Sequence, residues 1–251
     1  MIDQQTAKRR GMPAVILDGD DTLWQTEPLY DEARTDTATY VSSLGIDSQE
    51  FEQRQREVDL ERAASLGVAR VRFPGSSVEA ARSLAASHSI QLKRRQLRRV
   101  SSISSEVFQK KAPTDANAAD VIARLRDRFQ IALLTKGDEE VQRKRLADSG
   151  LAPLLDFAHI VDQKDEDSFR YVLSRLQANP LDSWTVGNSF RSDIVPALSF
   201  GMRAIWVEAD AWALEDAPEV ADYTGRYLTV KGLDEVPDLI TKAGEVARDR
   251  S

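Results

Sequence analysis

Three aspartates stand close together near the N-terminus, directly after a short apolar run. The run is Val15-Ile16-Leu17, and the chain continues Asp18-Gly19-Asp20-Asp21-Thr22. Because Gly19 has no Cβ, the backbone can turn there and bring Asp18 and Asp20 toward a common point. Crowded carboxylates repel one another unless a cation joins them, and oxygen ligands of this kind suit Mg²⁺ better than zinc. The stretch is therefore a candidate metal and catalytic site, although an acidic, solvated turn has the same composition.

The composition excludes several other kinds of site. The chain has 251 residues, no cysteine and two histidines, which excludes disulfides, zinc–thiolate sites and thiol nucleophiles and argues against a histidine-based metal site. A formal net charge of -7 argues against nucleic acid as the main partner. No stretch is apolar for long enough to span a bilayer, and the polar N-terminus lacks the apolar segment of a signal peptide. We expect a cytoplasmic protein without membrane association, and the oligomeric state stays open.

The segment 26–111 has the pattern of helices throughout. Apolar residues recur at helical spacing in four stretches, 30–44, 51–66, 78–85 and 97–108. Phe73-Pro74-Gly75 is predicted to interrupt the pattern, and Ser76 with Glu79 resembles a capping box that opens the third helix. Because nothing in this segment is typical of a strand, we predict a separate α-helical cap domain over residues 26–111.

The flanking residues, 1–25 and 112–251, alternate strands with helices. Short apolar runs mark five predicted strands, at 14–17, 131–134, 158–161, 184–186 and 204–207. This alternation predicts an α/β core with a doubly wound, Rossmann-like parallel sheet and helices on both faces. In such sheets ligands bind beyond the carboxyl ends of the strands.

Polar residues follow four of these predicted strands. They are Asp18 and Asp20 after the first, Thr135 and Lys136 after the second, Lys164 after the third, and Asn188 and Asp193 after the fourth. One polar residue at a strand end carries little weight. Four strands that bring a carboxylate pair, a hydroxyl, a lysine and a second acidic loop to one edge of a sheet predict an active site.

The ordered set of motifs resembles the haloacid dehalogenase (HAD) superfamily of aspartate-dependent hydrolases. The family's Asp-x-Asp-x-Thr motif is matched by Asp18 to Thr22, and its strand-ending Thr by Thr135. Its Lys ahead of a helix is matched by Lys164, and its Gly-Asp-x-x-x-Asp-like loop is approximated by Gly187 to Asp193. The loop departs from the pattern because Asn188 stands where Asp is most common. The helical segment corresponds in position to the family's inserted cap.

The resemblance implies a Mg²⁺-dependent phosphatase that acts on a small phosphorylated metabolite. Asp18 would attack phosphorus and form an aspartyl-phosphate, and Asp20 would be the general acid and base. Thr135 would hydrogen-bond a phosphoryl oxygen, while Lys164 and the metal would offset negative charge. The metal ligands that it implies are Asp18, the backbone carbonyl of Asp20, Asn188 and Asp193.

Other side chains are candidates for substrate contact. Lys136 stands beside Thr135, and Arg70 and Arg72 lie in a predicted loop of the cap, where they are candidates to hold a second anionic group. Trp24 either lines the cavity beneath the cap or packs the hinge.

Two other functions stay open. A halide-displacing dehalogenase of the same superfamily would use Asp18 on carbon, but it needs neither a metal nor a second acid, so Asp20 and Asp193 argue against it. A non-hydrolytic, phospho-accepting signalling receiver also combines Asp, Thr, Lys and Mg²⁺ on a doubly wound sheet. Receivers are much shorter, have no helical insertion and carry no double-Asp motif on the first strand.

Overall fold

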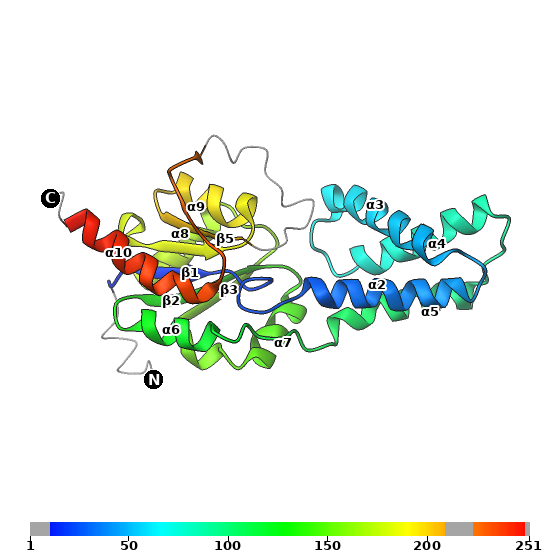
Figure 1. Ribbon diagram of the computed structural model, residues 1–251, viewed down its shortest axis with the longest axis horizontal. Coiled ribbons are helices and arrows are strands. Elements are labelled where there is room, and N and C mark those ends of the chain that lie inside the picture. The colour runs from blue at the N-terminus through cyan, green and yellow to red at the C-terminus, as the bar shows by residue number, and fades with distance from the viewer. Residues whose placement is uncertain (1–10, 209–222, 249–251) are drawn as a thin grey trace. The chain divides into compact units, whose positions relative to one another are not determined.

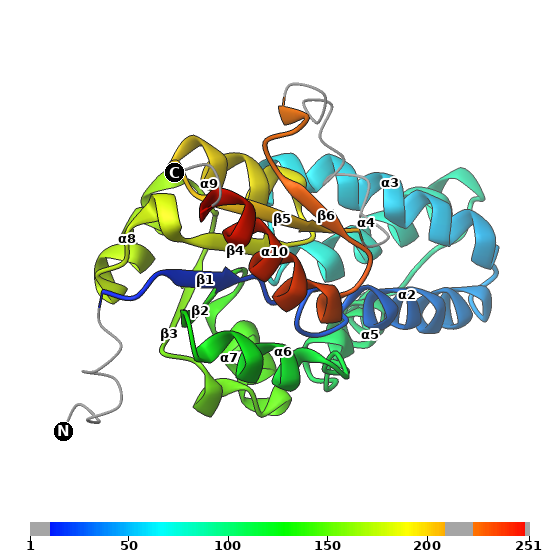
Figure 2. The ribbon, with the colours of Figure 1, turned by 60° about the vertical axis from the view of Figure 1, so that its left-hand side comes forward.

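The computed structural model describes residues 11–208 and 223–248. The chain divides into two compact units, Thr26–Ala112 and a unit made of the residues on either side of that segment. The first unit consists of helices, and the second contains a sheet with helices around it (Figures 1 and 2). The predicted fold class, an α/β core with a separate α-helical cap, is confirmed.

A six-stranded parallel sheet in the order β3-β2-β1-β4-β5-β6 forms the centre of the core unit. The strands are β1 (Ala14–Leu17), β2 (Gln130–Lys136), β3 (Phe157–Val161), β4 (Trp184–Gly187), β5 (Arg203–Val207) and β6 (Leu228–Val230). The predicted strands correspond to β1 to β5, whereas β6 is short and was not predicted. The chain runs from β1 to β3 in one direction and then returns to the other side of β1. The end of β1 is therefore the topological switch point, where ligands of open α/β sheets bind.

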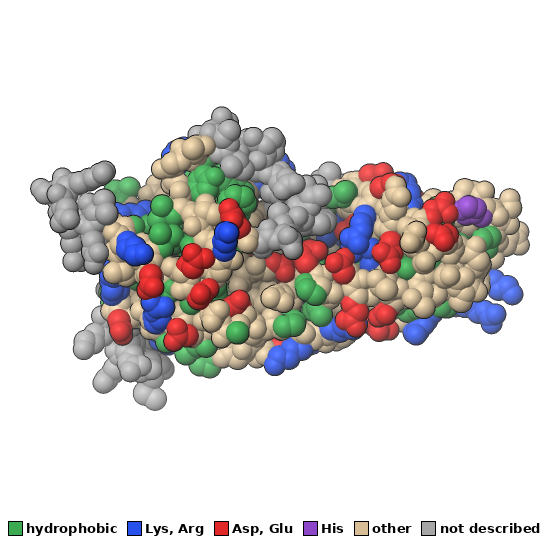
Figure 3. All heavy atoms as spheres, viewed as in Figure 1, with side chains coloured by type: hydrophobic (Ala, Val, Ile, Leu, Met, Phe, Trp, Pro, Cys, Tyr) green, Lys and Arg blue, Asp and Glu red, His purple; other side chains and the backbone are tan. Residues whose placement is uncertain are grey.

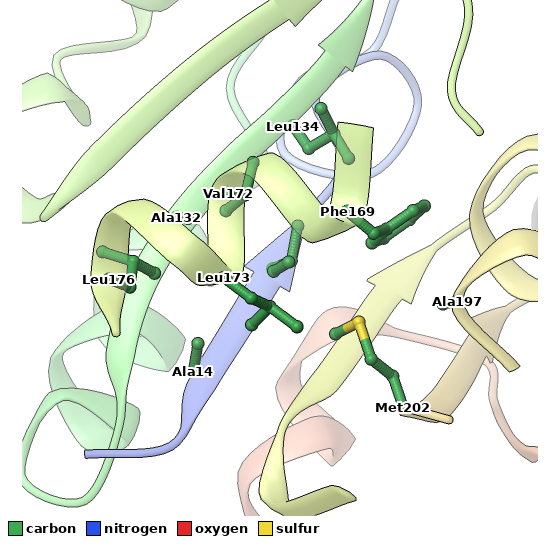
Figure 4. Packing of buried hydrophobic residues seen from close by; sticks show 10 residues of the cluster. Ala14, Ala132, Leu134, Phe169, Val172, Leu173, Leu176, Ala197 and Met202 are labelled. Carbon is green, nitrogen blue, oxygen red and sulfur yellow. The ribbon is translucent and has the colours of Figure 1, made fainter. Parts of the chain in front are cut away.

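Helices cover both faces of this sheet. They are α6 (Ala118–Arg126), α7 (Glu139–Ser149), α8 (Glu166–Leu176), α9 (Val195–Ser199) and α10 (Val236–Arg248). The apolar stripe of α8, at positions i, i+3, i+4 and i+7, packs against alternate residues of β1 and β2 (Figure 4); it consists of Phe169, Val172, Leu173 and Leu176. On the other face, α6 and α10 pack against each other (Figures 1 and 2). With both faces covered, the strands read as continuous apolar runs.

The cap unit contains four α-helices. They are α2 (Glu27–Ser42), α3 (Ser48–Leu66), α4 (Arg72–Ser87) and α5 (Arg94–Ser105). Asp47 caps α3 by accepting hydrogen bonds from the backbone N–H groups of Gln49 and Glu50, each at 2.9 Å. The four helices share one apolar core, to which each contributes at least one buried residue: Val41, Phe51, Leu84 and Val100.

The predicted start of the third cap helix was wrong. Helix α4 begins at Arg72, so Pro74 and Gly75 lie in its first turn and Ser76 is not its N-cap. Proline is tolerated there because N–H groups of the first turn have no partner within the helix. The Ser76 hydroxyl lies 2.9 Å from Asp59 Oδ1, and Arg72 donates to Asp59 Oδ2 at 2.7 Å. The buried ion pair between Arg72 and Asp59 of α3 therefore lets α4 begin before the capping signal at Ser76.

The surface carries both signs of charge. Acidic and basic side chains are intermixed on the face of the molecule shown in Figure 3. Among the residues that the structure describes, no helix combines the length and the apolar character that a bilayer crossing requires.

Candidate active site

Asp18 stands at the carboxyl end of the central strand β1. Its backbone N–H donates to the carbonyl of Val186 in β4 at 2.9 Å, which continues the sheet pairing to the last residue before the turn. The side chain is largely buried. The strand thereby holds this carboxyl group at the switch point of the sheet.

Lys164 joins two carboxylates that come from different strands. Its ammonium group donates to Asp18 Oδ1 and, at 2.5 Å, to Asp193 Oδ1. All three side chains are at most 8% exposed. Buried charges need partners of opposite sign, so this cluster is a buried ion-pair network rather than a solvated acidic turn.

Burial and charge act together on these groups. Burial, followed by the neighbouring Asp193 carboxylate, raises the pKa of Asp18 from 3.8 to about 7, although Lys164 acts in the opposite direction. For Lys164, burial by itself lowers the pKa, but the two aspartates outweigh it and raise the pKa above its ordinary value. Lys164 therefore stays charged, and the site still favours additional positive charge beside Asp18.

The loop after β4 turns Asp193 back toward the site. Ser189 accepts a hydrogen bond from the Ser192 N–H at 3.0 Å and opens a single π-helical turn, Phe190–Ile194. Asp193 Oδ2 in turn accepts from the Ser189 N–H at 3.0 Å. A Cβ on Gly187 would lie 2.2 Å from Asp193 Oδ2, so only glycine leaves room for this carboxylate. Single π-helical turns are frequent at functional sites.

Two oxygens converge on one hydroxyl beside Asp18. Thr22 Oγ1 lies 3.3 Å from Asp18 Oδ2 and 3.4 Å from Asn188 Oδ1. Within residues 11–208 and 223–248, no three acidic or histidine side chains form a metal site by themselves. A cation here would therefore need amide or backbone oxygens as well. Converging oxygens next to a carboxyl group with a raised pKa have the donor chemistry that suits Mg²⁺.

Thr135 presents a buried hydroxyl that no described residue hydrogen-bonds. The side chain is fully buried, and its Oγ1 atom has no partner in the described part of the chain. A Cβ on Gly19 would lie 2.9 Å from this oxygen, so the hydroxyl lies directly against the turn after Asp18. An unpaired buried hydroxyl costs about 1–3 kcal/mol, which is a reason to expect a ligand there.

Asp20 is held by three side chains, of which Gln142 and Arg145 were not predicted from the sequence. Its Oδ1 accepts from Trp24 Nε1 at 2.6 Å. Its Oδ2 accepts from Gln142 Nε2 at 2.9 Å and from an Arg145 guanidinium nitrogen at 2.5 Å. Gln142 and Arg145 lie three residues apart in α7, so one helix face carries both, and that spacing was the available signal.

The two remaining predicted substrate contacts lie in different units. Lys136, at the end of β2, donates to Ser192 Oγ at 3.0 Å and so adjoins the loop that carries Asp193. Arg72 is buried within the cap and pairs with Asp59. Substrate binding by Arg72 stays a prediction, although this pairing favours a structural role.

A family model matches most of the chain. The model, described as haloacid dehalogenase-like hydrolase, matches residues 12–201. The chain belongs to the haloacid dehalogenase-like hydrolase family. This confirms the resemblance and establishes that this HAD-like protein is of the hydrolase type.

A relative matches part of the chain in sequence, and its solved structure shares the fold. YfnB of Bacillus subtilis (strain 168) is 31% identical over 101 residues, which span 37% of this chain and 42% of YfnB, less than half its length. Its structure, described as bound to magnesium, has a TM-score of 0.66 at 18% identity and covers 92% of this chain and 99% of that one.

Two further solved structures share the fold. A haloacid dehalogenase-like family hydrolase from Xanthomonas campestris has a TM-score of 0.76 at 23% identity, with 96% of each chain covered. A HAD phosphatase from Thermococcus onnurineus has a TM-score of 0.61 at 22% identity and covers 91% of this chain and 98% of that one. Dehalogenases share the fold as well. The choice between phosphatase and dehalogenase must therefore come from the site.

Proposed function

We propose that this HAD-like hydrolase is a Mg²⁺-dependent phosphatase that cleaves a small phosphorylated metabolite through an aspartyl-phosphate. The observation that carries the proposal is the second aspartate, Asp20. Its carboxylate is held by three side-chain donors and is still 29% exposed. A held and accessible carboxyl group is what proton transfer to a leaving alcohol needs.

The two half-reactions follow from the roles of the two aspartates. An Asp18 oxygen attacks phosphorus as the bond to the ester oxygen breaks, and protonated Asp20 delivers its proton to that oxygen, which releases the alcohol. In the second half-reaction, the Asp20 carboxylate takes a proton from water as the water oxygen attacks phosphorus. The bond between phosphorus and the Asp18 oxygen breaks, inorganic phosphate leaves, and both aspartates return to their first states. One difficult displacement is thus divided into two easier ones.

Other residues stabilise the negative charge of the phosphoryl group. The Lys164 ammonium group lies beside Asp18, and the two neighbouring aspartates raise its pKa, which favours the charged form. The Thr135 hydroxyl, which has no hydrogen-bond partner among the described residues, is suited to donate to a phosphoryl oxygen. Asp18 and Asn188, with the Asp20 backbone carbonyl and Asp193, would hold the ion. A bound Mg²⁺ would supply charge neutralisation and Lewis-acid stabilisation of the phosphoryl oxygens.

The dehalogenase alternative explains less of the site. Displacement of a halide from carbon releases an anion that needs no proton, and it needs no metal. Asp20 and its three buried or partly buried donors would then have no chemical task. We therefore place dehalogenation second.

One assay separates the candidates. Hydrolysis of p-nitrophenyl phosphate is measured with excess chelator and then with added Mg²⁺, beside chloride release from a 2-chloro acid. We expect phosphate release that is lost with chelator and restored by Mg²⁺, and no chloride release. Chloride release that is independent of metal would favour the dehalogenase. Stable phosphorylation of the protein without turnover would favour a phospho-accepting protein. A screen of sugar phosphates, nucleotides and phosphorylated acids would then identify the substrate class.

A further inference from the structure

The three donors to Asp20 are divided unequally between its two oxygens. Oδ2 accepts from both Gln142 and Arg145, at 2.9 Å and 2.5 Å, whereas among the described residues Oδ1 accepts only from the Trp24 indole, at 2.6 Å. Each carboxylate oxygen accepts about two hydrogen bonds. Oδ2 is therefore fully occupied, one of its donors being a guanidinium cation. Oδ1 keeps one position that can take a proton.

Helix α7 is built to deliver these donors. The Gln142 and Arg145 side chains are almost completely buried, although both are polar. A Cβ on Gly137 would lie 2.9 Å from Gln142 Nε2, so the glycine between β2 and α7 leaves room for the amide. Gln142 Nε2 also lies 3.2 Å from the Lys136 carbonyl, which ties the amide to the end of β2. Burying a guanidinium group is costly unless it is paired, and the Arg145 guanidinium forms an ion pair with Asp20 Oδ2 at 2.5 Å.

We propose that Gln142 and Arg145 are positioning residues that fix the Asp20 carboxylate and confine its transferable proton to Oδ1. This inference rests on the proposed function, in which Asp20 is the general acid and base. With Oδ2 held by α7, only the Oδ1 proton passes to the leaving oxygen, and only Oδ1 takes it back from water. Helix α7, which follows Thr135 of β2, thus holds the general acid Asp20 in place.

The kinetic test uses the leaving group. Arg145→Gln removes the charge of the principal donor, Arg145→Lys retains it, and Arg143→Gln is the matched control on the same helix, because Arg143 is 70% exposed and pairs with Glu139. For each, kcat/KM is measured on p-nitrophenyl phosphate and on an alkyl phosphate. General acids contribute about 10²–10⁴-fold, mainly with poor leaving groups. Arg145→Gln should therefore lose about tenfold or more on the alkyl ester and little on the aryl ester.

Three comparisons make the result specific to positioning. Arg145→Lys should recover part of the loss on the alkyl ester, and Arg143→Gln should leave both substrates unchanged. In an Asp20→Asn background, Arg145→Gln should add no further preference for the aryl ester. An equal loss on both esters by Arg145→Gln, which is the signature of a general structural defect, would overturn the proposal.

A structural readout separates this proposal from the proposed function. In crystal structures, Arg145→Gln should rotate the Asp20 carboxylate away from α7, whereas Arg143→Gln should leave it in place. An unmoved carboxylate would overturn the positioning role, whatever the activity. If the wild-type protein hydrolyses neither ester, the proposed phosphatase function fails, and the rotation alone then decides whether α7 positions Asp20.

Discussion

Lys164→Met should destabilise the core unit far more than an ordinary lysine substitution. The change removes a cation that bridges two carboxylates, while its side chain is only 2% exposed. At the 2.5 Å separation from Asp193, the Coulomb attraction is on the order of 7 kcal/mol for an effective dielectric constant of about 20. Desolvation offsets part of it, and removing one partner of a buried pair costs about 3–5 kcal/mol. We expect Lys164→Met to lower the free energy of unfolding by that amount, because Asp18 and Asp193 then face each other without a cation between them.

A matched control exists on the surface. Lys144 pairs with Asp148 at the same 2.5 Å, but the two side chains are 36% and 29% exposed. Because exposed pairs contribute about 0–1 kcal/mol, Lys144→Met should have a small effect. Adding Asp193→Asn to Lys164→Met should restore part of the stability, since it removes one of the two repelling charges.

Tryptophan fluorescence can follow this unfolding in urea without interference from the cap. The chain has four tryptophans, Trp24, Trp184, Trp206 and Trp212, and none lies in the segment 26–112. The signal therefore reports the unit that contains Lys164, and the metal-free protein is used throughout. Equal losses for Lys164→Met and Lys144→Met would refute the reasoning. So would a double variant no more stable than Lys164→Met.

Four further outcomes are expected. Asp18→Asn should abolish phosphate turnover in a folded protein, since an amide cannot act as the nucleophile; substantial residual activity would contradict this. In the metal-free protein, the pKa of Asp18 is about 7 in the folded state against 3.8 in the unfolded chain, so the folded state binds the proton more tightly. The free energy of unfolding should therefore fall as the pH rises from 3.8 to about 7. Urea titrations from pH 4 to pH 7 should show this slope, and Asp18→Asn should flatten it. Asn188→Asp should lower the Mg²⁺ concentration for half-maximal activity, because it adds charge to the ligand set; an unchanged midpoint would count against coordination by Asn188. Gly187→Ala should displace Asp193, because Asp193 Oδ2 would lie 2.2 Å from the new Cβ. The variant should lose about 1–3 kcal/mol of the free energy of unfolding and most of the activity. Wild-type activity and stability would show that the loop relaxes freely.

Local patterns along the sequence were sufficient to predict the layout of the core. Strands buried on both faces must be apolar throughout, so runs such as Val15-Ile16-Leu17 are visible without tertiary information. A parallel sheet places the carboxyl ends of its strands at one edge, so the residues after those ends could be assigned to one site. Lys164 and Asp193 do meet Asp18 there. Strand β6 was missed because three residues, Leu228–Val230, are too short to show a period.

The contacts that complete the site depended on the tertiary structure. Arg145 and Gln142 lie more than 120 residues from Asp20 in the chain, in a helix whose charged sequence has no clear apolar face. The start of α4 at Arg72 likewise depends on Asp59 of another helix, which outweighs the local capping signal at Ser76. The sequence by itself determined which residue types stand at the strand ends, because burial constrains strands locally. Which oxygen of Asp20 stays open was decided only by folding, because a hydrogen bond between distant residues leaves no periodic trace in the chain.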